Sequence, residues 1–206
     1  MANELIKLTS PTTYTQVTAG NTGDILIQKI GGDVGFLADP TSWALYADST
    51  YTDVSPLSIN NAKVQIACDG LGGTTNKTQL SPNIAITDLW DAVTNRITPV
   101  NIGDAYSLRL TFDAQGPQNA YFDIGLDISS DIINSPIVIA RETKIHPKGT
   151  GVTSGYSFDV PIFSLSTFTT NGGALFIDTR DDAIQLDIFN INVFICRVHR
   201  AIGAEV

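Results

Sequence analysis

The chain has 206 residues, a formal net charge of −9 and charged side chains at only 16% of its positions. A chain of this length forms one domain, or one domain with a short extension, and can bury a core without a metal or a disulfide. The small share of charge excludes a coiled coil or a disordered chain, and the 12 scattered Lys and Arg residues lack the basic stripe that nucleic-acid binding requires. No apolar run approaches the ~20 residues of a membrane span, so we expect no membrane partner.

The first 38 residues differ from the rest of the chain. Short apolar stretches alternate there with Thr-, Gly- and Asn-rich stretches, without the apolar segment of a secretion signal, and chain breakers follow up to Asp39-Pro40. We predict an N-terminal arm or strand pair over residues 1–38 and one domain over residues 39–206. Two interpretations remain open, namely the first strands of the same sheet and an arm that docks the domain onto a larger assembly.

From residue 41 onward the apolar residues recur with a period of two. The alternation is clearest over 64–68, 106–112, 122–128 and 158–162, and Gly-rich turns separate these segments. Each strand then has one dry and one wet face, which favours antiparallel pairing. The pattern predicts an all-β, antiparallel jelly-roll sandwich with at most one short helix, over 88–96 and capped by Thr87.

The last predicted strand is apolar on both faces. The outer face of a sandwich strand normally meets water, so something must cover this one: a loop or the arm of the same chain, or another subunit packed around a symmetry axis. A change of phase at residues 190–192 indicates a β-bulge. If another subunit is the cover, the residues at its interface are predicted to be Phe189, Ile191, Val193, Phe194, Ile195, Arg197 and His199.

No catalytic motif is apparent, and we predict that the chain is not an enzyme and binds no cofactor. His146 is expected in a solvated loop and His199 at an interface, and neither accompanies a nucleophile motif. Cys68 and Cys196 lie in apolar strand patterns and are expected to be free thiols.

Two groups of residues are candidates for binding a ligand. Asp178, Asp181 and Asp182 could hold a calcium ion, because hard cations take several oxygens from one turn, but their spacing is not that of a calcium loop and an acidic hairpin tip is the simpler interpretation. Trp43, Tyr46 and Tyr51 could stack on sugar rings, or form the end of the core or an interface.

Three segments resemble a known family. The segment NRITPVNIGDAYSLRLTF at 95–112, together with FDVPIF at 158–163 and VFICRVHR at 193–200, is similar to C1q/TNF-like jelly rolls. It most resembles the C-terminal halves of small structural proteins of tailed bacteriophages, of the capsid decoration, head-fibre or fibre-knob type. The similarity covers roughly residues 41–200 and rests on apolar strand patterns and turns, not on reactive residues.

The resemblance implies a homotrimer and a virion structural protein. The chain would then be a capsid decoration or cement protein of the head-fibre type, attached to the major capsid protein. The alternative is a fibre tip or knob that recognises a host glycan or surface protein. Either function implies assembly in the host cytoplasm and a final location on the virion, at the capsid surface for the first.

Overall fold

The computed structural model describes residues 5–10, 13–17, 25–28, 34–37, 42–80, 88–147, 149–179 and 185–199, with side chains from residue 42 onward. Its strands are β1 (Leu5–Ser10), β2 (Thr13–Val17), β3 (Ile25–Gln28), β4 (Val34–Leu37), β5 (Ser42–Ala47), β6 (Leu57–Asn60), β7 (Lys63–Gln65), β8 (Trp90–Asp91), β9 (Arg96–Ile97), β10 (Ala105–Gln115), β11 (Tyr121–Asp127), β12 (Val138–Ile145), β13 (Ser154–Phe163), β14 (Gly173–Asp178) and β15 (Gln185–His199), and the described residues form one helix, α1 (Ser166–Asn171).

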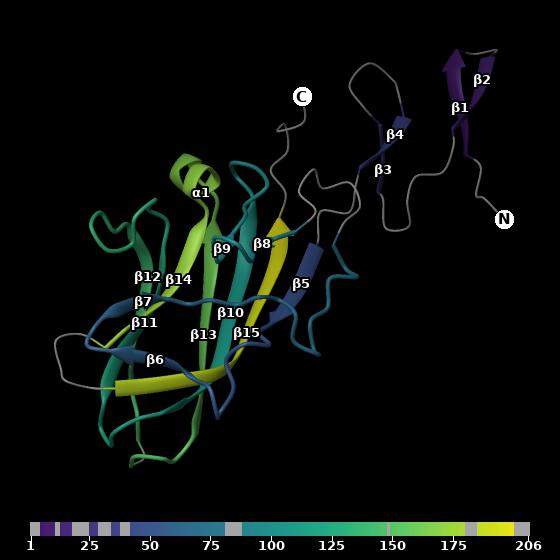
Figure 1. Ribbon diagram of the computed structural model, residues 1–206. Coiled ribbons are helices and arrows are strands. Elements are labelled where there is room, and N and C mark those ends of the chain that lie inside the picture. Colours follow the sequence, from purple (N-terminus) through teal and green to yellow (C-terminus); the bar gives the residue numbers. More distant parts are fainter. Residues whose placement is uncertain are drawn as a thin grey trace.

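Two antiparallel sheets pack face to face (Figure 1). The front sheet has five strands in the order β13-β10-β15-β5, with β6 also paired to β15. The back sheet has six strands in the order β12-β11-β14-β9-β8, with β7 also paired to β14. Neighbours such as β5 and β15 are far apart in the sequence, which is the crossed connectivity of a jelly roll. The predicted fold class is therefore confirmed.

The core lies between the inner faces of the two sheets. In β10, buried Leu108, Leu110 and Phe112 alternate with more exposed residues, as the period of two predicted. Phe122 and Ile124 of β11 face them from the back sheet within the same apolar cluster.

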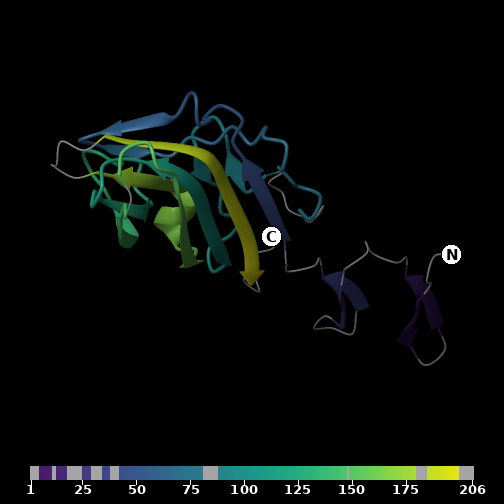
Figure 2. The same cartoon turned by 90° about the horizontal axis from the view of Figure 1, so that it is seen from below.

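A bulge divides β15 into two parts. Residues 189–192 lie opposite residues 111–113 of β10, so β15 has one more residue there than its partner, and Asn190 adopts a φ of 54°. β15 changes direction near this point: one part pairs with β6 and the other with β5 (Figures 1 and 2). The predicted bulge is confirmed. It keeps Ile188 before it and Ile191 after it in the same core.

The prediction of a helix over 88–96 is wrong, because this segment forms the hairpin of β8 and β9. The carboxylate of Asp91 accepts hydrogen bonds from the Val93 N–H at 2.8 Å and the Thr94 hydroxyl at 2.7 Å. Such local bonds stabilise a turn in competition with a helix. Thr87, the predicted cap, lies outside the described residues.

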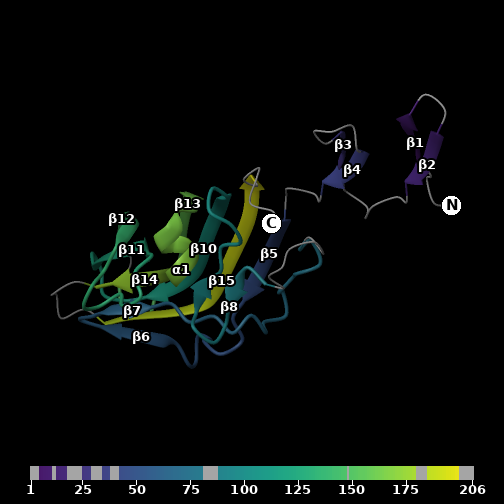
Figure 3. The same cartoon turned by 90° about the horizontal axis from the view of Figure 1, so that it is seen from above.

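The described parts of the first 37 residues form two hairpins, β1-β2 and β3-β4. Within the described residues, neither hairpin pairs with a strand of the front or back sheet (Figure 3). The predicted boundary at residues 38 and 39 falls outside the described residues and stays a prediction.

Candidate functional site: the outer faces of the sandwich

An apolar band lies on the outer face of the front sheet. It consists of Trp43 and Leu45 of β5 and Phe194 and Cys196 of β15, which alternate with core residues along both strands and are partly exposed. Trp43 lies opposite Cys196 and Leu45 opposite Phe194, and directly paired residues share a face. The rings of Trp43 and Phe194 have centroids 5.8 Å apart. The band is thus one continuous apolar surface.

The same face is polar on its other half. Arg109 of β10 lies opposite Phe194 and forms an exposed ion pair with Asp159 of β13. The free edge of β5 is occupied by a loop of the same chain, because the Leu45 N–H donates to the Asn76 carbonyl at 2.8 Å. This loop covers the edge of the sheet and leaves the band partly exposed.

The predicted interface residues divide between two environments. Ile191, Val193 and Ile195 are at most 1% exposed, and their side chains pack in the core of this one chain. The apolar pattern of this strand does not distinguish its outer face from its inner face, which the chain's own back sheet covers. Phe194 and His199 are at least partly exposed, and for them an intersubunit contact stays a prediction. Phe189 is only 4% exposed and therefore offers little surface to a second subunit.

Arg197 is also internal. Its guanidinium lies 3.6 Å from the carboxylate of Asp104, and both side chains are buried. The Tyr106 hydroxyl donates to the same carboxylate at 3.1 Å and accepts from the Val100 N–H at 2.8 Å. Burial raises the pKa of Tyr106, so the phenol stays protonated. This network joins the end of β15 to the start of β10.

Beside the bulge the outer face is hollowed into two adjoining grooves. One of about 200 Å³ runs past Leu45 and Phe194, and one of about 440 Å³ reaches Tyr156. Thr111 and Asn192 line both, and the Asn192 amide donates to the Asn190 carbonyl at 2.9 Å. The lining therefore combines an aromatic ring with amides and hydroxyls.

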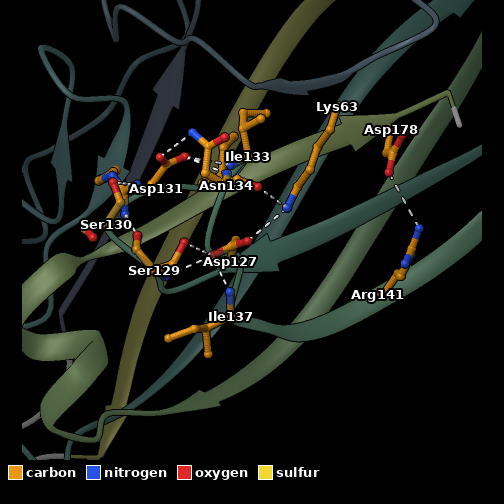
Figure 4. A network of polar contacts seen from close by, with 12 residues as sticks. Lys63, Asp127, Ser129, Ser130, Asp131, Ile133, Asn134, Ile137, Arg141 and Asp178 are labelled. Carbon is orange, nitrogen blue, oxygen red and sulfur yellow. Dashed lines mark hydrogen bonds and ion pairs between the residues drawn. The ribbon is translucent and has the colours of Figure 1, made fainter.

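The outer face of the back sheet carries a buried ion pair (Figure 4). The ammonium of Lys63 lies 2.9 Å from the carboxylate of Asp127, donates to the Ile132 carbonyl at 2.8 Å, and lies 4.1 Å from the centre of the Phe176 ring. These contacts hold the loop that follows β11 against the sheet.

Asp127 also accepts hydrogen bonds from the backbone and hydroxyl of Ser129 and from the Ile137 N–H. Burial alone would raise the pKa of Asp127, but the hydrogen bonds from Ser129, Lys63 and Ile137 outweigh burial and lower this pKa below its ordinary value. The carboxylate is therefore held ionised, as a structural anchor.

Three further candidate residues, His146, Cys68 and Cys196, lie among the described residues. His146 is fully buried, and its Nδ1 lies 2.8 Å from the Tyr156 hydroxyl, so its predicted solvated position is wrong. The His146 N–H donates to the Ala120 carbonyl at 2.8 Å, and this bond holds the backbone where the ring is enclosed. Cys68 and Cys196 are free, as predicted, and burial raises the pKa of Cys68 to about 12.

The predicted aromatic group is also divided. Trp43 lies on the apolar band, whereas Tyr46 is buried and donates a hydrogen bond to Asp88. Tyr51 packs against the core.

No metal site is formed by three His, Cys, Asp or Glu residues within the described parts of the chain. Asp178 lies 3.7 Å from Arg141, and Asp181 and Asp182 fall outside the described residues, so the calcium alternative stays a prediction. In the described residues, no helix has the length and apolar character needed to cross a bilayer.

No model of a known protein family matches the chain, and no curated protein matches it. Solved structures similar to it include the vertex protein P5 of PRD1, with 12% identity over 93% of this chain and 91% of that chain and a TM-score of 0.47. The Eiger TNF of S. frugiperda has 7% identity over 81% and 98% of the two chains and a TM-score of 0.43. The globular domain of zebrafish complement 1qA has 13% identity over 79% and 99% and a TM-score of 0.37. At these values no function is transferred to this chain.

Proposed function

We propose that this chain is a virion structural protein that forms a homotrimer and decorates or cements a capsid by binding the major capsid protein. The observation that carries the proposal is the apolar band of Trp43, Leu45, Phe194 and Cys196 on a sheet face that would otherwise meet water. The sequence resemblance of residues 95–112 and 158–200 to trimeric phage jelly rolls supports the virion location.

The band favours association because burying apolar surface stabilises a complex by roughly 25 cal/mol per Å². The rings of Trp43 and Phe194 make it a compact aromatic patch, and aromatic residues are enriched in the centres of protein interfaces. The face is apolar on the β5-β15 half and polar around Arg109 and Asp159. A face with two unlike halves suits contact with a different surface of the next copy, and such contacts form a ring when the rotation between copies closes.

The trimer is tested by the mass of the purified protein in light scattering coupled to size exclusion. The wild type is expected at the mass of three chains of 22.1 kDa each. Phe194→Asp is expected to give folded monomers, because its side chain lies outside the core. Ser157→Asp, which lies on the exposed side of β13 and does not line the groove beside Phe194, is the control and should remain trimeric. A monomeric wild type, or a trimeric Phe194→Asp variant with the same circular dichroism, would contradict the proposal.

The second candidate is a fibre tip that binds a host glycan, and the grooves beside the bulge favour it. Phe194 offers a ring to stack on a sugar, and Thr111 and Asn192 offer hydrogen-bonding groups. Both candidates use the same face of the sheet. A glycan array therefore distinguishes them. Binding of a glycan by the wild-type protein would support the fibre tip, and no binding is expected if the trimer buries this face.

A further inference from the structure

A second apolar surface lies at one end of the sandwich, outside the apolar band. Its four members, called here the end patch, are more than half exposed: Ile102 at 57%, Phe163 at 60%, Leu165 at 58% and Val198 at 52%. Scattered single apolar residues are normal on a protein surface, but a group from adjacent segments marks an interaction site.

The three segments that carry the end patch are joined by hydrogen bonds and strand pairing. The Gly103 N–H donates to the Ser164 carbonyl at 2.7 Å, and the Ser164 N–H donates to the Asp104 carbonyl at 2.8 Å. These two bonds place the turn of Ile102 beside Leu165. Ala105 pairs with Phe163 on one side and with His199 on the other, which brings the ends of β13 and β15 to the same place.

The end patch carries no exposed acid in a chain whose net charge is −9. Residues 101–105, 163–171 and 197–199 contain one carboxylate, that of Asp104, and it is fully buried beside Arg197. The helix α1, which follows Leu165, has no acid in its first turn and no base in its last. Described segments without an exposed acid can approach another acidic protein with less of the repulsion that the negative net charge creates.

Leu165 occupies a position where its own fold does not favour leucine. It is the N-cap of α1, with φ −106° and ψ 173°, and its side chain makes no capping hydrogen bond. Ser, Asp and Asn are preferred at an N-cap and leucine is among the poorest residues there. Residues that disagree with the local preference of the fold are found most often at functional sites, so an exposed leucine at this N-cap indicates a functional contact.

The N-terminal segment enters the sandwich at this same end. β5 begins at Ser42, which pairs with Arg197 next to Val198, so the start of β5 and the end of β15 lie side by side, and α1 lies at the same end of the sandwich in Figure 1. A partner held by the first 41 residues is therefore brought to the end patch. Two linked contacts bind far more tightly than either alone, because the second forms within one complex.

We propose that the end patch docks against an apolar protein surface on the same capsid partner that the N-terminal segment binds. The partner surface presents aliphatic or aromatic side chains and needs no basic cluster, because the patch offers it no carboxylate. This inference rests on the proposed function, and it assigns to the end patch a contact separate from the one between copies.

The test measures cosedimentation of the purified protein with particles of the encoding virus assembled without it. Ile102→Ser combined with Leu165→Asp removes two apolar side chains, and Asp suits the N-cap, so the fold is retained. The control is Val54→Asp, at a turn beyond the opposite end of β5, where Val54 is 89% exposed.

The double variant is expected to keep the mass of the wild type and to bind particles at least tenfold more weakly, while the control binds as the wild type does. Wild-type binding by the double variant would overturn the inference and leave the proposed function standing. A change of oligomeric mass in the double variant would also overturn it, because the patch would then lie between copies. A wild type that does not bind particles would overturn the proposed function together with this inference.

Discussion

Replacing Lys63 by methionine tests whether the ion pair on the back sheet is an internal contact. The side chain of Asp127 is 0% exposed and that of Lys63 is 15% exposed, and their charged atoms are 2.9 Å apart. Methionine keeps much of the packing over Phe176 but leaves a buried carboxylate without its counter-charge. Removing one partner of a buried pair costs about 3–5 kcal/mol.

We expect the lower end of that range, about 3 kcal/mol, because Ser129 and the Ile137 N–H still donate to Asp127 after the substitution. Adding Asp127→Asn removes the unpaired charge. The double variant is therefore expected to lose less stability than the sum of the two single variants, by roughly 1–2 kcal/mol.

The free energy of unfolding is measured by urea denaturation at one fixed protein concentration, with the fluorescence of Trp43 and Trp90 as the probe. The matched control is Arg109→Met, which breaks the exposed pair with Asp159, where the side chains are 60% and 51% exposed. An exposed pair contributes about 0–1 kcal/mol. If Lys63→Met cost no more than this control, the assignment of Lys63 and Asp127 as a buried pair would be refuted.

Three further predictions concern acid, packing and the N-terminal segment. The pKa of Asp127 is lower in the folded than in the unfolded chain. Its contribution to the free energy of unfolding is therefore complete above the unfolded pKa of about 3.9 and is lost as the pH falls through the folded pKa. Asp127→Asn should flatten the decline of the free energy of unfolding in that acid range, as measured by urea denaturation at several pH values. Gly125→Ala should destabilise the fold by about 1–3 kcal/mol in urea denaturation, because its Cβ would lie 2.4 Å from the Phe176 ring, and an unchanged midpoint would contradict this packing. Deleting residues 1–38 should leave a folded protein with the same number of copies per oligomer that no longer cosediments with particles; persistent binding would show that this segment is not the anchor.

The strands could be predicted from the sequence because alternation reports directly on a half-buried sheet. The alternation of β10 held along its length, and the change of phase at Asn190 located the bulge. The hairpin of β8 and β9 could not be recognised, because its apolar spacing also fits a helix and the turn depends on side-chain bonds of Asp91.

The surfaces were less accessible to sequence reasoning, since a strand pattern gives two faces without saying which one meets the second sheet. The pattern therefore groups Val193 with Phe194, although only Phe194 lies on the outer face. The end patch cannot be predicted from the sequence, because Ile102, Leu165 and Val198 are distant in the chain and come together only through the strand pairing of Ala105 and the backbone bonds of Ser164. Leu165 offered one signal, a leucine directly before a helix, but that helix was itself not predicted.

The position of β15 between β5 and β10 has a consequence for biosynthesis. The central strand of the front sheet is made after both of its neighbours, which must wait with open hydrogen-bonding edges until residues 185–199 have left the ribosome. Pairings between such distant segments form slowly, and open strand edges recruit other chains. A product truncated before residue 185 would therefore retain two unpaired edges on β5 and β10 and is expected to aggregate rather than to fold into a smaller sandwich.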